Sequence, residues 1–471
     1  MKTNKNVIGE SGIKFGTSGA RGLVTDFTPD VCAAFTISFL KTVEKDYTFQ
    51  RVAVAMDNRP SSPEMAASVC AAIESCGYDV DFYGVLPTPA LALQSMMDNV
   101  PSIMITGSHI PFDRNGIKFY RPDGEISKKD EVGILNNSNP FITVNPKLPQ
   151  TKNTAQITYH DRYKNYFGDK CLNGLKIGIY EHSSAGRDLY AKLFTALGAQ
   201  VTCLGRSDEF VPIDTEAVSD LDKERAKSWS EEHGFDLIFS TDGDGDRPLI
   251  ADERGNWLRG DIVGILTSKL LGIEALAVPV SCNTAIEKSG FFKGVKRTRI
   301  GSPYVIEAFK ELKTYHSFAG FEANGGFLLG SDLNDSGNTL RSLPTRDALL
   351  PFMVLASHIA KEKIPLSELV VRLPRRFTSS DRIQNIPKNQ SLSLIEQVLS
   401  NPNKMIETFG LTNQKVVEID RTDGVRMTLD NDVIIHLRPS GNAPELRCYV
   451  ETDNQNYSDE LVRQVLSAIN R

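Results

Sequence analysis

The stretch Asp236–Arg247 reads DLIFSTDGDGDR and joins a short apolar run to a loop of alternating aspartate and glycine. The apolar run is typical of a buried strand. Asp242, Asp244 and Asp246 then follow with glycines between them, so in a loop their carboxylates can converge on one cation. Ligand sets made only of oxygen favour a hard divalent ion such as Mg²⁺. Because Arg247 adds a planar guanidinium suited to phosphate, the stretch indicates phosphoryl chemistry.

Two other interpretations compete with a magnesium loop here. A turn rich in aspartate and glycine is often simply solvated. An EF-hand calcium loop would use the same three aspartates, with Glu253 at its twelfth position. The calcium loop is disfavoured because Arg247 stands where its invariant glycine belongs, and because a strand-like run replaces the entering helix.

Length and composition limit the class of protein. A chain of 471 residues predicts about three or four domains. The formal net charge of −6 argues against nucleic acid as a partner. Seven scattered cysteines without a CxxC pair are typical of free thiols in a reducing cytoplasm. Since we find neither a signal-peptide core at the N-terminus nor an apolar run long enough for a membrane span, we expect a cytoplasmic protein without a membrane partner.

Three segments repeat a strand–helix–strand pattern, over residues 52–82, 176–204 and 275–295. Their spacing indicates related α/β domains with mostly parallel sheets. The link over 136–153 is rich in Asn and Pro and is a plausible boundary, and a second lies near 372–376. Beyond it the pattern changes to strands plus one long helix over 391–400.

The predicted fold class is therefore α/β, with three related domains built on mixed or parallel sheets and a C-terminal α+β domain. The predicted domains span residues 1–150, 151–256, 257–370 and 371–471.

A second loop of interest, TGSH over residues 106–109, follows the apolar strand 102–105. In α/β domains the carboxyl ends of strands present ligands and nucleophiles. Ser108 is therefore a candidate nucleophile, with His109 and Lys118 as nearby groups that could activate it or neutralise charge. The alternative is an ordinary turn.

Two further loops carry polar side chains between glycines or strands. The loop GFEANGG over 320–326 offers Glu322 and Asn324, a pair suited to vicinal hydroxyls, although a plain hairpin turn is the alternative. The loop RPSGNAPELR over 438–447 combines two arginines with small hydrogen-bond donors. That combination favours an anion pocket over a solvated hairpin.

Together these loops resemble, in chain order, those of the α-D-phosphohexomutase superfamily of phosphomannomutases, phosphoglucomutases and their relatives. TGSHIP over 106–111 is similar to the phosphoserine loop, and 242–247 to the metal loop. The loop 320–326 is similar to the sugar-specificity loop, and 438–447 to the phosphate-binding loop. FGTSGARG over 15–22 resembles the opening motif of the family, in which the arginine faces the phosphoserine.

The resemblance implies a role for each matching residue. Ser108 carries a phosphate and, with Asp242, Asp244 and Asp246, holds one Mg²⁺ per subunit. The transferring phosphoryl group is surrounded by Arg21, His109, Lys118 and Arg247. The sugar is held by Glu322, Asn324 and Ser302, and the non-reacting phosphate by Arg438, Ser440, Gly441, Asn442 and Arg447. The four domains are expected around a central cleft, with a hexose 1,6-bisphosphate as activator.

The implied function is that of a phosphohexomutase, an intramolecular phosphotransferase. We expect it to interconvert mannose 6-phosphate and mannose 1-phosphate through phosphoserine and a 1,6-bisphosphate. The specificity loop departs from the family's usual forms, and Ser302 stands where many bacterial relatives have histidine, so glucose, glucosamine and N-acetylglucosamine phosphates remain alternatives. A Mg²⁺-dependent sugar phosphatase and a non-catalytic sugar-phosphate sensor are alternatives of other classes. The expected partner is a small sugar phosphate, bound by a monomer or homodimer.

Overall fold

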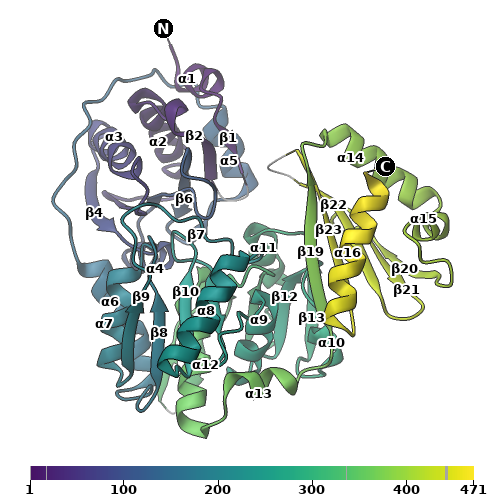
Figure 1. Ribbon diagram of the computed structural model, residues 1–471. Coiled ribbons are helices and arrows are strands. Elements are labelled where there is room, and N and C mark those ends of the chain that lie inside the picture. The colour runs from purple at the N-terminus through teal and green to yellow at the C-terminus, as the bar shows by residue number, and fades with distance from the viewer. Residues whose placement is uncertain (1, 17–18, 336, 441–443, 471) are drawn as a thin grey trace.

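The computed structural model describes residues 2–16, 19–335, 337–440 and 444–470. Within these residues the strands form four larger sheets and one two-stranded ribbon, which follow one another along the chain (Figure 1). The α/β class predicted from the sequence is confirmed. The predicted boundaries at 150, 256 and 370 fall between sheets and stay a prediction.

The first sheet has the order β1-β2-β6-β5-β3-β4, with β7 paired to β6. Its strands are β1 Lys14–Phe15, β2 Gly19–Leu23, β3 Arg51–Met56, β4 Asp79–Val85, β5 Ser102–Ile105, β6 Arg114–Arg121 and β7 Gly124–Glu125. The helices beside it are α1 Asn4–Glu10, α2 Pro29–Val43, α3 Ser62–Ser75, α4 Thr88–Asp98 and α5 Lys128–Leu135, with a short 3-10 turn at Val24–Asp26.

The second sheet has the order β11-β10-β8-β9. Its strands are β8 Lys176–Tyr180, β9 Gln200–Leu204, β10 Leu237–Thr241 and β11 Pro248–Ala251. The helices of this part of the chain are α6 Thr154–Phe167, α7 Arg187–Ala196 and α8 Asp220–His233.

The third sheet has the order β13-β12-β14-β15-β18. Its strands are β12 Ala275–Pro279, β13 Gly294–Thr298, β14 Phe318–Phe321, β15 Phe327–Leu329 and β18 Leu343–Asp347, and the separate ribbon is β16 Leu333–Asp335 with β17 Asn338–Leu340. The helices are α9 Gly260–Leu270, α10 Ala285–Lys288, α11 Ser302–Leu312, α12 Leu349–Glu362 and α13 Leu366–Val371.

These three sheets share one four-strand pattern. A central strand pairs in parallel with the strand that follows it and with a third strand, and the third strand pairs antiparallel with a fourth. The central strands are β3, β8 and β12, and the antiparallel pairs are β5–β6, β10–β11 and β14–β15. The related α/β units that the sequence predicts are therefore present.

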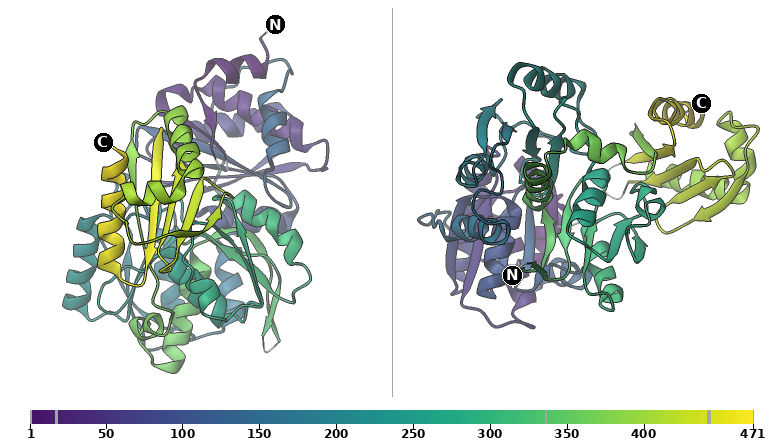
Figure 2. Two further views of the ribbon diagram at one scale, coloured as in Figure 1. Left: turned by 90° about the vertical axis from the view of Figure 1, so that its right-hand side faces the viewer. Right: turned by 90° about the horizontal axis from the view of Figure 1, so that it is seen from below.

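The fourth sheet is antiparallel throughout and has the order β19-β23-β22-β21-β20. Its strands are β19 Phe377–Gln384, β20 Val416–Asp420, β21 Val425–Leu429, β22 Ile434–Pro439 and β23 Glu445–Thr452, and its helices are α14 Lys388–Ser400, α15 Pro402–Thr408 and α16 Gln455–Ile469. This part of the chain lies to one side of the rest (Figures 1 and 2).

The helix predicted over 391–400 is present within α14, but the expectation of a single helix in this last part is wrong, because α15 and α16 follow it. In α16 the residues Leu461, Val462, Val465 and Leu466 are buried among the apolar side chains of the fourth sheet. They recur at helical spacing, and the side chain of Asn454 caps the first turn, so this helix could have been predicted from the sequence.

In the described part of the chain, apolar side chains form three main clusters, one of which lies within the first sheet and its helices. One large cluster runs from Ala53 to Leu373 and joins side chains of the first three sheets. The fourth sheet and its helices have a core of their own, and polar side chains connect it to the rest. At this junction Glu451 accepts hydrogen bonds from the backbone N–H and the hydroxyl of Thr284 and, at 2.6 Å, from Arg376 Nε.

In the part of the chain that the structure describes, no helix combines the length and apolar character needed to cross a bilayer.

Because the fourth sheet has a separate core, a cavity made there should destabilise that part selectively. We expect Leu461→Ala, which truncates a fully buried side chain of α16, to lower the free energy of unfolding of this part by about 2–5 kcal/mol. Hydrogen exchange in denaturant would measure protection of β21 and β22 separately from that of β8 and β10. Equal loss of protection in both pairs would contradict two separate cores.

Candidate active site

The predicted functional loops occupy the same position in each of the first three sheets. Ser108 lies between β5 and β6, the three aspartates lie between β10 and β11, and Glu322 lies between β14 and β15. Each loop therefore follows a strand that pairs in parallel with one neighbour and antiparallel with the other. The repeated topology gives three equivalent loops with three different chemistries.

The Ser108 loop is buried and tightly held. Ser108 adopts a left-handed conformation with φ of 55°, and its backbone N–H donates to Thr106 Oγ1 at 2.8 Å. Its hydroxyl donates to Asp242 Oδ2 at 2.6 Å and lies 3.5 Å from His109 Nδ1. The candidate nucleophile therefore faces the metal loop directly, as the sequence predicts.

Arg59, which the sequence interpretation missed, holds the backbone of this loop by hydrogen bonds. It is buried and donates to the backbone carbonyls of Ser108 at 2.9 Å and Ile110 at 2.6 Å. A Cβ atom at residue 107 would lie 2.7 Å from Arg59 Cζ, so the guanidinium packs closely against the backbone of the loop. The signal was available, because Arg59 follows the carboxyl end of the parallel strand β3.

The metal loop is a buried cluster of carboxylates. Asp242, Asp244 and Asp246 are fully buried, and each offers an oxygen within 4.8 Å of the others. Their burial excludes the solvated turn that the sequence left open. The Oδ1 atoms of Asp244 and Asp246 accept no hydrogen bond from any residue that the structure describes. Two buried anionic oxygens without a donor, beside a third carboxylate, fit a hard divalent cation.

The other oxygens of Asp244 and Asp246, their Oδ2 atoms, contact cations and a hydroxyl group. Lys118 Nζ lies 2.5 Å from Asp244 Oδ2 and 2.8 Å from Asp246 Oδ2. Thr88 Oγ1 donates to Asp244 Oδ2 at 2.6 Å, and Arg346 Nε lies 3.0 Å from Asp246 Oδ2. The sequence interpretation missed Thr88 and Arg346. No motif surrounds Arg346, so only the folded sheet reveals it.

The three carboxyl groups differ in their pKa values. Burial, with the charges of Asp244 and Asp246, raises the pKa of Asp242 well above its usual range. Burial also acts to raise the pKa of Asp246, but Arg346, Lys118 and Arg247 outweigh it and hold that pKa below its usual range. The loop therefore combines one carboxyl group that resists ionisation with one that ionises readily.

Basic side chains surround the Ser108 hydroxyl. Arg247 donates to His109 Nδ1 at 2.8 Å, and burial with Arg247, Arg21 and Arg447 lowers the pKa of His109 well below its usual range. His109 is therefore a neutral acceptor at pH 7. Burial and the nearby arginines lower the pKa of Arg21 to about 10. This concentration of positive charge suits an oxyanion such as a phosphoryl group.

The sugar-specificity loop is a hairpin connection, as the alternative interpretation of its sequence predicted. Glu322 is buried, and its Oε2 accepts from Arg346 at 3.2 Å. Asn324 Oδ1 accepts from the backbone N–H of Gly326 at 3.0 Å, and its carbonyl accepts from Thr215 at 2.6 Å.

Ser302, at the start of α11, is fully buried, and its hydroxyl donates to Glu125 at 2.8 Å. The sugar contact of Ser302 stays a prediction.

The described ends of the predicted phosphate-binding loop belong to β22 and β23 of the fourth sheet. Arg438 and Arg447 are paired across β22 and β23, and Arg438 Nε lies 2.9 Å from Asp423 Oδ2. The backbone N–H of Ser440 donates to the carbonyl of Glu445 at 2.8 Å. Because Arg447 contributes to the lowered pKa of His109, it is close enough to act on the Ser108 loop electrostatically.

Four residues of the predicted motifs, namely Gly441, Asn442, Thr17 and Ser18, lie outside the described residues.

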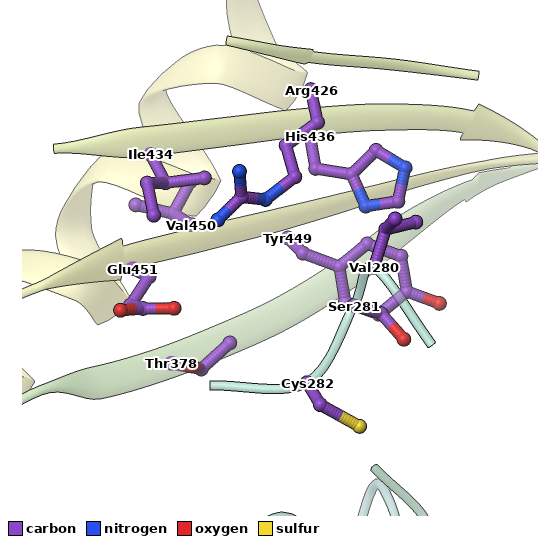
Figure 3. Close-up of a pocket in the computed structure, with 10 residues that line it drawn as sticks. All are labelled: Val280, Ser281, Cys282, Thr378, Arg426, Ile434, His436, Tyr449, Val450 and Glu451. Atoms are coloured by element: carbon purple, nitrogen blue, oxygen red, sulfur yellow. The ribbon is translucent and has the colours of Figure 1, made fainter. Parts of the chain in front are cut away.

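A small cavity at the junction of the third and fourth sheets is not this site. Its lining includes Cys282, Arg426 and Glu451 (Figure 3). Its volume is about 10 Å³, which is room for one water molecule and too little for a sugar phosphate. This cavity is therefore not a candidate for the sugar-phosphate site that the sequence predicts.

A repeated α/β fold whose equivalent loops bring a serine, three carboxylates and several cations together defines an enzyme of phosphoryl transfer. Family models match the chain at residues 12–139 (phosphoglucomutase/phosphomannomutase, alpha/beta/alpha domain I), 260–377 (domain III) and 371–468 (C-terminal domain). The chain belongs to this phosphoglucomutase/phosphomannomutase family, within the α-D-phosphohexomutase superfamily. The resemblance drawn from the sequence is thereby confirmed.

Individual relatives agree with this assignment. The phosphomannomutase of Salmonella muenchen is 56% identical over 467 residues, covering 98% of this chain and 97% of that protein. The phosphomannomutase of Sinorhizobium fredii is 41% identical over 475 residues, covering 98% and 99%. A solved structure of a putative phosphomannomutase from Thermus thermophilus has a TM-score of 0.77 at 18% identity, covering 98% of this chain and 99% of that one.

The raised pKa of Asp242 has a consequence for stability without metal. A carboxyl group whose pKa is higher in the folded than in the unfolded state binds its proton more tightly when folded. As pH falls from neutral through this raised pKa towards the usual value of 3.8, protonation of Asp242 should therefore stabilise the fold. Below that window, Asp246 acts oppositely, because its folded pKa is lowered.

We accordingly expect Asp242→Asn to raise the Tm of the metal-free protein at pH 7 and to weaken Mg²⁺ binding. The amide retains the shape of the side chain and replaces a carboxyl group whose charged form is disfavoured by burial and by Asp244 and Asp246. Differential scanning calorimetry with a chelator would measure the shift, and Asp208→Asn, at a side chain that is 95% exposed, should leave Tm unchanged. A lower Tm for Asp242→Asn than for the parent protein would contradict the expected charge repulsion.

Proposed function

We propose that the protein is a phosphomannomutase, which interconverts mannose 6-phosphate and mannose 1-phosphate. The observation that carries the proposal is the 2.6 Å hydrogen bond between the Ser108 hydroxyl and Asp242, within a buried cluster of carboxylates and cations. A phosphoserine needs such surroundings, and a simple binding protein does not. The choice of mannose is supported by the 56% identity to the Salmonella muenchen phosphomannomutase over nearly the full length.

In this proposal Ser108 is the phosphoryl carrier. Its phosphorus–oxygen bond breaks as a sugar hydroxyl oxygen bonds to phosphorus, and the proton of that hydroxyl passes to the serine oxygen, which gives a hexose 1,6-bisphosphate and the free Ser108 hydroxyl. In the second half-reaction the other phosphoryl group returns to Ser108, and the sugar oxygen that it leaves takes up a proton. The serine hydroxyl then gives up its proton, and Asp242 Oδ2 is an acceptor 2.6 Å away.

Mg²⁺ would be held by Asp242, Asp244 and Asp246 together with the Ser108 phosphate, where it would neutralise charge on the phosphoryl oxygens. The chain's own cations act in the same direction. Arg21, Lys118 and Arg247 converge on this place, and preorganised charges of this kind stabilise the transition state more than the ground state.

The remote end of the substrate is assigned to the fourth sheet. Arg438, Ser440 and Arg447, with Gly441 and Asn442, would hold the phosphate that is not reacting, while Glu322 and Asn324 would hold sugar hydroxyls. Binding energy from that remote phosphate would orient the reacting hydroxyl. Since the bisphosphate has to turn end over end, the fourth sheet with its separate core is the part expected to move.

The role of Ser108 can be tested by mass and turnover. Active protein should carry one phosphoryl group on Ser108, found by peptide mapping, and Ser108→Ala should lose turnover. The buried Ser102→Ala, on the preceding strand, is the matched control and should remain phosphorylated and active. Substantial turnover by Ser108→Ala without phosphate elsewhere would sink the proposal. A hexose 1,6-bisphosphate should reactivate dephosphorylated enzyme, whereas a phosphatase would only release phosphate.

The division between sugar and phosphate recognition can be tested by two substitutions. Arg447→Ala removes a charge-assisted contact needed in both half-reactions, so it should cost about 1.5–3 kcal/mol, roughly 10- to 150-fold in kcat/KM, for mannose and glucose phosphates alike. Asn324→Ala should change the ratio between the two sugars. Kinetics of both variants on both sugars would measure this. If Arg447→Ala altered only the ratio, the two loops would be wrongly assigned.

A further inference from the structure

Three consecutive residues of β18 connect parts of the molecule that are far apart in sequence. Thr345 donates to Glu125 Oε1 at 3.1 Å, and Glu125 belongs to the first sheet. Asp347 accepts hydrogen bonds from Tyr159, at 2.6 Å, and from Tyr163, both on α6. Arg346, between them, reaches the metal loop of the second sheet. The backbone of this strand is therefore fixed on both sides of Arg346.

The Arg346 guanidinium itself joins two carboxylates from different loops. Its Nε lies 3.0 Å from Asp246 Oδ2 and its Nη1 lies 3.2 Å from Glu322 Oε2. Arg346 is 3% exposed and Asp246 is fully buried, so neither charge is screened by water. Because the guanidinium is planar and rigid, it fixes the separation and relative orientation of the two carboxylates it binds.

The contact also determines which oxygen of Asp246 is available to a metal. Arg346 and Lys118 hold Oδ2, while Oδ1 accepts no hydrogen bond within the described part of the chain. Arg247 Nε lies 3.6 Å from that same Oδ1. Without Arg346, Asp246 could rotate towards Arg247, and the oxygen directed to the metal would be lost.

We propose that Arg346 is a positioning residue that couples sugar recognition to metal binding, because it holds Glu322 and Asp246 in one fixed arrangement. The inference rests on the proposed function, which assigns the sugar to Glu322 and the metal to Asp246. A change at Arg346 therefore alters both the preferred sugar and the affinity for Mg²⁺. A change at Glu322 alters only the preferred sugar, and a change in the metal loop alters only the affinity for Mg²⁺. Arg346 touches neither substrate nor metal in this account.

Four variants separate these effects. Arg346→Met removes both contacts, and Glu322→Gln changes the sugar side only. Thr88→Val removes the hydroxyl that holds Asp244 and changes the metal side only. Thr345→Val is the matched control, since it breaks the contact of the neighbouring residue with Glu125 and leaves both carboxylates in place.

Two measurements give the readout. Isothermal titration calorimetry of metal-free protein with Mg²⁺ should show affinity lowered about 10- to 100-fold in Arg346→Met and Thr88→Val, the range found for groups that orient metal ligands. Glu322→Gln and Thr345→Val should bind Mg²⁺ like the parent protein. The ratio of kcat/KM for mannose 1-phosphate to that for glucose 1-phosphate, at saturating Mg²⁺, should shift in Arg346→Met and Glu322→Gln and stay constant in the other two.

Arg346→Lys keeps the proposal testable if the methionine variant does not fold. A lysine has a single ammonium group and cannot bond both carboxylates with fixed geometry, so at least one of the two quantities should still change. The double variant Glu322→Gln/Arg346→Lys should show no further shift in the sugar ratio beyond Glu322→Gln alone, because Arg346 acts on the sugar through Glu322.

An unchanged Mg²⁺ affinity or an unchanged sugar ratio in folded Arg346→Met would overturn the coupling, and so would the absence of both changes in Arg346→Lys if the methionine variant does not fold. So would equal changes in Thr345→Val, which would indicate a general structural role. If the parent protein turned over none of the hexose phosphates, the proposed function would fail instead, and the calorimetric arm would still test whether Arg346 positions Asp246.

Discussion

Burial of three carboxylates in one short loop is the constraint on which this structure depends. Transfer of a charge from water into a protein interior costs several kcal/mol unless partners compensate it. The compensating cations come from different parts of the chain: Lys118 from β6 of the first sheet and Arg346 from β18 of the third. Charge neutralisation therefore requires the first three sheets to meet at the metal loop, and the continuous apolar cluster beneath them keeps them together.

The repeated topology explains how such a loop could be assembled. In each of the first three sheets the last parallel strand is followed by a strand that pairs with it antiparallel. The predicted functional loop connects these two strands. One copy displays Ser108, one the aspartates and one Glu322, so a single architecture supplies the residues proposed as phosphoryl carrier, metal ligands and sugar contact. The fourth sheet has another topology and its own core, which suits a part that follows the substrate through two orientations.

Much of this could be predicted from the sequence. The strand 102–105 has the predicted bounds, and the predicted segment 176–204 begins with β8 and ends with β9, since apolar runs flanked by glycine or polar residues define buried parallel strands well. The loops were recognisable because aspartate, glycine and arginine cluster within a few residues. Arg59, Thr88 and Arg346 could not be found in the same way. Each stands alone in the sequence, and its role arises from contacts with residues 24 to 156 positions away.

The central claim is that the buried aspartate loop is a metal site whose available oxygens are selected by the cations around it. Diffraction from crystals soaked in Mn²⁺, with anomalous scattering, tests this most directly. The account predicts one ion bound by Oδ1 of Asp244, Oδ1 of Asp246 and an oxygen of Asp242, with Lys118 and Arg346 still on the Oδ2 atoms. An ion bound elsewhere, or an ion that displaces Lys118 from both carboxylates, would contradict it.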